Sequence, residues 1–586
     1  MFLSIEFGLV VVALLLAFLR PQLSSEWLDG IERSFGRLAR RQKLSVLLVG
    51  LAALGARAAV LPILPIADPT VHDEFSYLLA ADTFAHGRLA NPPHPMWIHF
   101  ETFHVIWHPT YSSMYPPAQG LVLAAGQVIA GHPFWGVWFG VGLMCAAICW
   151  MLQGWLSPEW ALLGGALAVV RYGIFSYWAN SYWGGAVGAI GGALVLGALP
   201  RIVRFEYTSD ALLMGLGLAI LANSRPYEGL IFSLPVGIAL FVWIFRKKGP
   251  SLWTATRRVV VPLSTVVILA ALATGSYFWR VTGSPFRFPQ QVDRDNYASA
   301  PYFLWQSPRP EPIFNHEVIR DFYIGWELPK YEETRTAAGL IKSESEKIVK
   351  CGFFFLGPTL ALPILAGIGS TRYGLTWASL SSNTRFLLMV FGVSVAGLAL
   401  EVYFSLHYAA PMTGLILALV LVAMRQLRIW TWRGRPTGLF ITRASVLICL
   451  LVPAVRVASS ALHVPFHGEN LETCCSSGRG NWFRAGIQSK LERNGKQNLV
   501  IVRYGANHNV VNEWVYNKAD IDHSPVVWAR DMGAEKNEEL IEYFKDRKVW
   551  LVEPDEAPPR LSPYPTPLGS TASAILVPLG HPRVDR

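Results

Sequence analysis

The chain has 586 residues, of which 52% are hydrophobic and only 15% are charged. Apolar runs long enough to cross about 30 Å of hydrocarbon recur along most of its length, which excludes a water-soluble globular protein and predicts a polytopic all-α membrane protein. The net charge of +10 is therefore interpreted as loop charge that orients the spans, in preference to nucleic-acid binding.

The first apolar runs, near residues 4–19 and 44–62, flank a basic segment from Arg20 to Lys43. Basic residues follow the first run and do not precede it, so we expect an uncleaved span and no signal peptide. Because short basic loops stay in the cytoplasm, this segment is placed there and the polar loop 63–117 outside. The same rule places three further basic segments in the cytoplasm: 201–204, 246–258 and 425–443.

Four apolar stretches lie between Gly120 and Arg201, but four crossings would place the basic Arg201 loop on the wrong side. The stretch 118–131 is the shortest and follows two prolines, so we expect a re-entrant or surface helix there. The other predicted spans lie near 134–153, 159–175, 183–199, 210–222, 226–245, 258–278, 351–370, 386–404, 407–424 and 444–461. This arrangement gives about 12 spans in a membrane domain of residues 1–462.

The tail, residues 463–586, differs in composition from the membrane domain. "NLVIVRY" and "KVWLVEP" are typical of buried strands, and "NWFRAGIQSKLERNG" and "EKNEELIEYFKDRK" of amphipathic helices. These patterns predict a small extracytoplasmic α/β domain without a glycine-rich phosphate loop. The polar loops 63–117 and 279–350 are predicted on the same outer side.

The first outer loop opens with Asp73 and Glu74, directly after the second span. The segment from about Thr70 to Gly87 has the pattern of a surface helix, in which two carboxylates in the first turn are favourable caps. A carboxylate at a helix start is also held rigidly enough to act as a general base. The two interpretations are compatible, and the residues alone do not separate them.

The order of several short motifs resembles that of membrane glycosyltransferases of the GT-C class. The motifs are the Asp-Glu pair after an early span, a long outer loop ending in "YPPAQ", a proline-bounded short helix and a later "HYAAPMTGLILAL". The pattern is most similar to bacterial relatives of the protein O-mannosyltransferases and the lipid A aminoarabinose transferases. The resemblance covers residues 44–425 and not the tail, and "HYAAP" departs from the Arg-Tyr form common in such enzymes.

The resemblance implies roles for residues on the outer side. Asp73 is the expected general base, Glu74 orients substrate or supports the fold, and Glu101 is the candidate second carboxylate. Arg225 is the candidate cation for the donor phosphate, because an arginine at the outer end of a span opposes the positive-inside bias; its alternatives are an interfacial arginine or a partner of Glu228. The remaining candidates are His407 and Tyr408 at the donor phosphate, and Tyr115, Asn180, Tyr182, Tyr227 and Glu228 at the substrate.

Several histidines lie in the first outer loop, among them His94, His99, His104 and His108. His104 and His108 have the spacing of metal ligands on a helix, but the neighbouring prolines favour irregular backbone, so no metal ligand is assigned. A divalent metal ion stays an alternative, since some GT-C enzymes use one and others do not.

The predicted function is that of an inverting hexosyl or pentosyl transferase that uses a polyprenyl-phosphate sugar at the outer face of a bacterial inner membrane. The acceptor is a glycan, a lipid or a protein. Two alternatives stay open: a transporter or flippase, and a non-catalytic protein of polysaccharide assembly. A transporter would place ionisable residues at mid-membrane between repeated halves, whereas here the charges gather at one interface and no repeat is evident.

Overall fold

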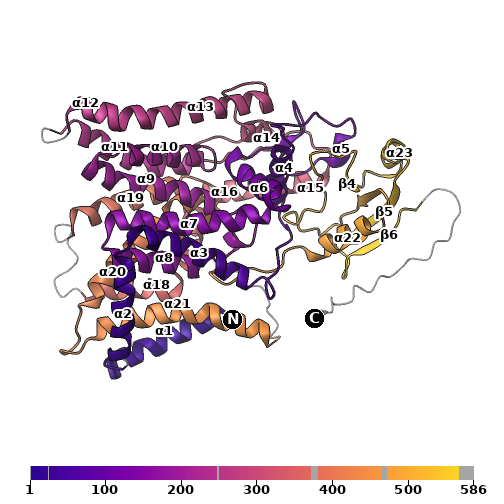
Figure 1. The fold of residues 1–586 in the computed structure, drawn as a ribbon. Coiled ribbons are helices and arrows are strands. Elements are labelled where there is room, and N and C mark those ends of the chain that lie inside the picture. Colours follow the sequence, from indigo (N-terminus) through magenta and orange to yellow (C-terminus); the bar gives the residue numbers. More distant parts are fainter. Residues whose placement is uncertain (1, 24, 247–249, 371–379, 463–471, 566–586) are drawn as a thin grey trace.

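The computed structural model describes residues 2–23, 25–246, 250–370, 380–462 and 472–565. Figure 1 shows an array of long helices on one side and a small sheet with two helices on the other. The predicted domain boundary at residue 463 lies outside the described residues. The helical array confirms a polytopic helical membrane protein, and the division into two domains stays a prediction.

Within the described residues, nine helical segments are long and apolar enough to cross a membrane. Several correspond to single helices: α1 (Phe2–Leu19), α3 (Gln42–Ala59), α7 (Phe134–Trp155), α9 (Ala186–Phe205), α11 (Pro226–Ile244) and α21 (Thr437–Ala461). The others join shorter elements: α12 (Leu252–Ala255), η2 (Thr256–Val260) and α13 (Val261–Thr282); α17 (Ala337–Cys351), η4 (Gly352–Leu356) and α18 (Gly357–Ser370); η6 (Leu406–Met412) and α20 (Thr413–Arg428). All of these segments overlap predicted spans.

Shorter apolar helices complete the array: α6 (Pro117–Ala130), α8 (Pro158–Tyr172), α10 (Thr208–Ala222) and α19 (Ser382–Leu398). Helix α6 begins at a proline, whose missing N–H is not needed in the first turn, and ends at Gly131. Its length is below that of a full span, as expected for this stretch. The count of about 12 spans stays a prediction.

The segment between the first two spans forms helix α2 (Ser25–Ala39). Glu32 on this helix accepts hydrogen bonds of 3.0 Å from both Arg428 and Arg443, which belong to the last basic segment. The first and last basic segments therefore lie on the same side of the helical array, in agreement with their common assignment from the sequence.

The outer loops form short elements. The first loop contains α4 (His72–Ala85), α5 (Trp97–Phe100) and the antiparallel pair β1 (Val105–Ile106) and β2 (Ser112–Ser113). The loop after α13 contains α14 (Pro289–Tyr297), α15 (Glu317–Arg320), η3 (Asp321–Glu327) and α16 (Leu328–Thr334). In Figure 1, α4, α5 and α15 lie between the long helices and the sheet.

The tail forms a four-stranded sheet in the order β4-β3-β5-β6. The strands are β3 (Asn498–Val502), β4 (Val526–Arg530), β5 (Lys548–Glu553) and β6 (Arg560–Pro563), with helices α22 (Trp482–Arg493) and α23 (Ala534–Tyr543). Strands β3, β4 and β5 are parallel, and β6 is antiparallel to β5. Strands β3 and β5 and both helices confirm the sequence patterns, whereas β4 and β6 were not predicted.

Buried polar contacts join this sheet to the first outer loop. The Arg530 guanidinium of β4 donates to the Glu101 carbonyl oxygen over 2.5 Å, and the Thr102 hydroxyl donates to the Glu513 carboxylate over 2.7 Å. The N–H of Ala519 donates to the Asp82 carboxylate of α4 over 2.8 Å. The tail and α4 therefore form one packed unit on one side of the array.

Helix α20 is central in the array. In its segment, 78% of the most apolar 18-residue stretch is buried, against 6% in the segment of α12 and α13 at the edge of the array. The element before it, η6, packs directly on α9. A Cβ added at Gly192 of α9 would lie 2.1 Å from the Pro411 carbonyl oxygen, so only glycine permits this approach. The close contact fixes η6, which carries His407 and Tyr408, beside the loop that precedes α9.

Candidate functional site

The start of α4 is fixed by the carboxylate of Glu74. It accepts the backbone N–H groups of Thr70, Val71 and Tyr182 over 2.9, 3.3 and 3.1 Å, which are donors that a helix start and a loop would otherwise leave unpaired. Burial raises the pKa of Glu74 to about 7, against the effect of these three N–H groups, and the nearby Asp73 adds to the rise. The structure therefore places Glu74 as a buried anchor between α4 and the Tyr182 loop.

Asp73 points elsewhere, into a cluster with two histidines and a tyrosine. Its carboxylate accepts a hydrogen bond from the Tyr115 hydroxyl and lies 3.2 Å from Nδ1 of His72 and 4.0 Å from Nε2 of His104. The side chains of His72 and His104 are only 6% and 8% exposed, whereas that of Asp73 is 21% exposed. Asp73 is thus the member of the cluster that an outside molecule can reach.

The cluster keeps the Asp73 carboxylate charged. Burial alone would raise the pKa of Asp73, but His72, His104 and the Tyr115 hydroxyl lower it below its usual range. Burial lowers the pKa of His104 to about 3, so this imidazole is neutral at physiological pH. Burial also raises the pKa of Tyr115, with a contribution from Asp73, so the phenol keeps its proton and donates it to the carboxylate.

The same residues form a set of metal-ligand atoms. Within the described residues, His72, Asp73 and His104 are the one group of three histidine, cysteine or acidic side chains whose ligand atoms lie within 4.8 Å of one another. Nε2 of His72 and Nδ1 of His104 are buried without a hydrogen-bond partner in this part of the chain, whereas Nδ1 of His72 faces the Asp73 carboxylate. Two imidazoles and one carboxylate suit a first-row transition metal, and the ring nitrogens without a partner fit that use.

Two stacked tyrosines lead from Asp73 to Arg225. The ring of Tyr115 stacks on that of Tyr77, with centroids 4.3 Å apart. Tyr77 lines a small cleft together with Gln119, Arg225 and His407. Arg225 precedes α11, and its guanidinium lies 4.7 Å from the centre of the Tyr408 ring. The predicted phosphate-binding residues Arg225, His407 and Tyr408 are therefore brought together beside Asp73's neighbours.

Arg225 is held as a buried cation. Its side chain is 14% exposed and lies 3.9 Å from the Glu228 carboxylate, which is too long for a tight ion pair. Burial alone would lower the pKa of Arg225, but the nearby Tyr77 hydroxyl and Glu228 raise it above its usual value. A partly satisfied buried guanidinium attracts an anion strongly, because little solvent screens its charge.

His407 is positioned by aromatic neighbours. Its Nδ1 lies 3.2 Å from the Tyr177 hydroxyl, and its ring packs on Trp183 with centroids 4.9 Å apart. Tyr227 and Glu228 line a second small cleft with Tyr408, and the Tyr227 hydroxyl donates to the Gly397 carbonyl oxygen over 3.0 Å. Tyr227 and Tyr408 therefore form part of the wall of this second cleft.

Glu101 lies outside the Asp73 cluster. Its carboxylate accepts hydrogen bonds from the Tyr297 hydroxyl over 2.7 Å and the Asn315 amide over 3.0 Å, and the residue is 2% exposed. Burial raises the pKa of Glu101, against the effect of these two donors. Glu101 therefore connects the first outer loop to the loop after α13.

Asn180 and Tyr182 bond the protein itself. The Asn180 amide donates to the carbonyl oxygens of Ile174 and Ser176, and the Tyr182 hydroxyl donates to that of Ala67. Both side chains are buried. Asn180 stabilises the Tyr182 loop from within, and Tyr182 holds that loop against the segment that enters α4.

The structure shows how His104 and His108, the histidines with the spacing of metal ligands on a helix, lie relative to each other. The backbone from His104 to His108 is not helical, and His104 has a positive φ of 60°, so the two rings do not share a helix face. His104 instead faces His72, with ring centroids 4.5 Å apart, and His108 packs on Trp97. Sequence analysis missed His72 and Tyr77; the His-Asp order at residues 72–73 was the available signal for the first.

Neither a protein-family model nor a curated protein sequence matches the chain. Solved structures of the oligosaccharyltransferase of Archaeoglobus fulgidus are similar. The apo form is 10% identical with a TM-score of 0.46, covering 87% of this chain and 69% of that one. The complex with Zn and sulfate is 12% identical with a TM-score of 0.46, covering 87% and 67%. AglB with an inhibitory peptide and a dolichol-phosphate is 9% identical with a TM-score of 0.42, covering 87% and 69%. Similarity at this level leaves the function to be argued from the site.

Proposed function

We propose that the chain is a multi-pass membrane glycosyltransferase that moves a sugar from a lipid-linked donor to an acceptor beside Asp73. One observation carries the proposal: an accessible, ionised carboxylate lies at a fixed helix start, joined through two stacked tyrosines to a buried arginine. A group that receives a proton and a cation that receives a phosphate are the two functions that this transfer needs.

Asp73 is proposed to bind the acceptor. The acceptor hydroxyl or amide would replace the Tyr115 hydroxyl as hydrogen-bond donor to the carboxylate, which orients the nucleophile and takes its proton as the new bond forms. A low pKa makes Asp73 a weak base in the free protein. An anionic donor bound nearby would raise that pKa, because like charges disfavour the ionised form, and would thereby strengthen the base.

Arg225 is proposed to bind the phosphate of the donor. The leaving lipid phosphate gains negative charge as the sugar departs, and a buried cation stabilises that charge better in the transition state than in the ground state. Gln119 and His407 line the same cleft and supply further polar contacts.

His72, Asp73 and His104 are the residues that would hold a divalent metal ion. Such an ion would act as a Lewis acid that orients the acceptor and offsets negative charge at the reacting atoms. Glu74 and Glu101 are assigned positioning functions, because the carboxylates of both are occupied by protein donors.

The finer assignments rest on the resemblance of the sequence motifs to the GT-C class. They are a polyprenyl-phosphate donor, inversion at the anomeric carbon, transfer of a hexose or pentose, and a bacterial inner membrane with the tail outside. The location of Asp73 directly after a span supports an outer-face reaction at the bilayer surface.

The test is sugar transfer by the purified full chain in nanodiscs, with a panel of radiolabelled polyprenyl-phosphate sugars and a membrane extract as acceptor. Asp73→Asn should lose transfer while keeping the melting temperature of the wild type. The matched control is Asp520→Asn, which changes an exposed carboxylate of the tail that pairs with His523. Equal turnover by Asp73→Asn and wild type would remove Asp73 from the mechanism; no transfer from any donor would reject the function.

A further inference from the structure

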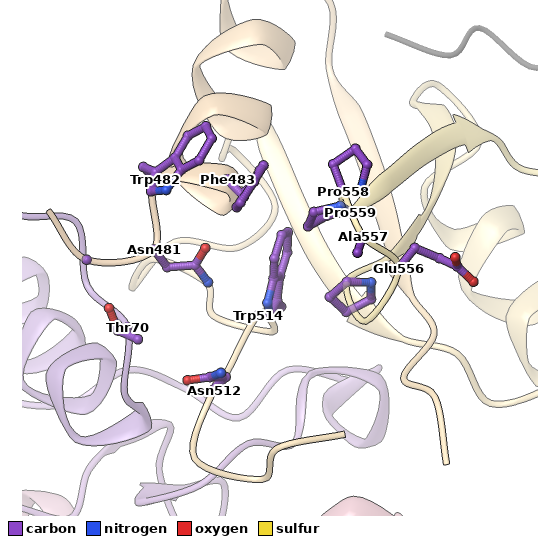
Figure 2. A pocket seen from close by; sticks show the side chains of 12 residues that line it. Thr70, Asn481, Trp482, Phe483, Asn512, Trp514, Glu556, Ala557, Pro558 and Pro559 are labelled. Atoms are coloured by element: carbon purple, nitrogen blue, oxygen red, sulfur yellow. The ribbon is translucent and has the colours of Figure 1, made fainter. Parts of the chain in front are cut away.

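A pocket of about 600 Å³ lies between the tail and the segment that enters α4. Its walls come from three parts of the tail, and Thr70 closes it from the other side. The walls are residues 480–483, then Asn512 and Trp514, and then Pro554 with residues 556–559. Figure 2 shows Trp514 between the aromatic pair Trp482 and Phe483 and the turn at Ala557–Pro559.

The pocket is part of the folded structure, because its first two walls are both joined by backbone bridges to the short segment that enters α4. Asp68 pairs with Gly480 and Val71 pairs with Asn512 through backbone bridges. Gly480 has a φ of +77°, and a Cβ there would lie 1.7 Å from the Asp68 carbonyl oxygen, so the bridge requires glycine.

The second wall is held from behind. Glu513 accepts the N–H groups of Trp514 and Val515 over 2.8 and 2.7 Å, and its other oxygen forms a buried ion pair of 2.6 Å with Arg530. Arg484 donates to the Trp514 carbonyl oxygen over 2.8 Å. The aromatic floor of the pocket is therefore rigid before any ligand arrives, which lowers the cost of binding.

The lining combines flat apolar faces with neutral polar groups. Trp482 stacks on Phe483 with centroids 3.7 Å apart and is 47% exposed. Trp514 also lines the pocket, and only 4% of the residue is exposed. The side chains of Asn481 and Asn512 stand beside it (Figure 2).

The charges of the lining residues limit the class of ligand that the pocket can bind. Among the described residues that line the pocket, none is positively charged and one, Glu556, is negatively charged. Such a lining disfavours phosphates, nucleic acids and acidic peptides. The flat faces of the indole rings can pack against the C–H groups of a ligand ring. Amide and indole donors, and amide and carboxylate acceptors, lie at the edge and can bind hydroxyl groups. This combination suits a neutral ring that carries hydroxyl groups.

We infer that this pocket is a binding site for a neutral saccharide. Its role as a subsite for the glycan part of the donor or the acceptor rests on the proposed transferase function, but the binding itself does not. The pocket lies beside the segment that enters α4, because Thr70 lines it and the Thr70 N–H donates to the Glu74 carboxylate of that helix over 2.9 Å. A sugar bound there would lie beside the segment that leads into α4, the helix that carries Asp73.

The experiment is isothermal titration of the full chain in nanodiscs with neutral oligosaccharides, released either from a lipid-linked donor pool or from acceptor glycans. Wild type is expected to bind one of the two pools. Trp482→Ala and Asn512→Ala should weaken this binding roughly ten-fold. The matched control, Trp253→Ala, removes a tryptophan of α12 that is 74% exposed and outside the pocket, and it should bind like wild type. The pool that binds identifies the source of the saccharide.

Two readouts separate this inference from the proposed function. Asp73→Asn should bind the saccharide normally but transfer nothing, and Trp482→Ala should raise KM with kcat unchanged. Transfer by wild type without saccharide binding, or unchanged binding by both pocket variants, would overturn the inference and leave the transferase intact. Binding of a neutral peptide in place of every saccharide would overturn it in favour of a peptide site. Saccharide binding without any transfer would uphold the pocket and reject the transferase.

Discussion

Arg530 on strand β4 and Glu513 form an ion pair of 2.6 Å in which the side chains are 3% and 1% exposed. The pair lies behind the saccharide pocket and also bonds Glu101 and Thr102 of the first outer loop. Because a buried charge without its partner is costly, Glu513→Ala should reduce the free energy of unfolding of the tail by about 3 kcal/mol.

Urea denaturation followed by tryptophan fluorescence measures this change, with Asp520→Asn as the exposed control. The apolar double variant Glu513→Leu/Arg530→Met should recover part of the loss, since both charges are then removed together. A loss in the single variant no larger than that of the control would contradict the assigned role of the pair.

Removing the Tyr115 hydroxyl should weaken the ionised form of Asp73. Tyr115→Phe keeps the stack on Tyr77 and deletes only the hydrogen bond, so the pKa of Asp73 should rise. The acid limb of the pH–rate profile should then move to higher pH. Tyr172→Phe, which deletes a hydroxyl bonded to the Phe355 carbonyl oxygen elsewhere, is the control. Identical profiles for Tyr115→Phe and wild type would separate Tyr115 from Asp73 in function.

Metal content tests the histidine cluster directly. Protein purified without chelator should contain close to one transition-metal ion per chain by mass spectrometry, and His72→Ala and His104→Ala should each lose most of it. His523→Ala removes an exposed histidine of the tail and should keep the wild-type content. Equal metal in all four proteins would show that the ion binds elsewhere.

Arg225 should act on the donor more than on the acceptor. Arg225→Gln removes the buried cation, and transfer should fall by about a hundred-fold, since one such electrostatic contact is worth roughly 3 kcal/mol in a transition state. Arg280→Gln removes an exposed arginine at the end of α13 and serves as the control. If the loss appeared only at low acceptor concentration, the phosphate assignment would be wrong.

The pKa of Glu74 gives stability a defined pH dependence. The folded value of about 7 exceeds the ordinary 4.5, so the folded state holds the proton more tightly than the unfolded state. This contribution, about 3 kcal/mol, is fully present below the unfolded pKa and is lost as pH rises through about 7. The melting temperature of wild type should fall relative to that of Glu74→Gln between about pH 5 and pH 8. A constant difference across that range would show that Glu74 does not titrate there.

The sequence predicted the elements whose signals are local. Apolar runs located the spans, and Asp73 and Glu74 in a first helical turn located the start of α4. The different functions of Asp73 and Glu74 could be predicted in part from the sequence, because adjacent residues on a helix point in different directions. The pairing of Glu74 with Tyr182, 108 residues away, depends on tertiary structure and has no local signal.

Contacts between distant segments account for what was missed. The partner of His72 is His104, which comes from an irregular loop that only the fold brings back to α4. Glu101 was selected because it is acidic and lies in the right loop, whereas its surroundings come from the loop after α13. Strand β4, "VVWAR", has five residues, as β3 has, and its parallel pairing with β3 is not visible from either segment alone.

The bridges from Asp68 and Val71 to the tail also determine at which stage of synthesis the site around Asp73 can form. A ribosome makes α4 early and residues 480–530 late, so the segment that positions Asp73 is without its partners while the spans are being inserted. The proposed transferase is therefore inactive as a nascent chain. Its activity begins only after residues 480–530 have folded against the segment that enters α4.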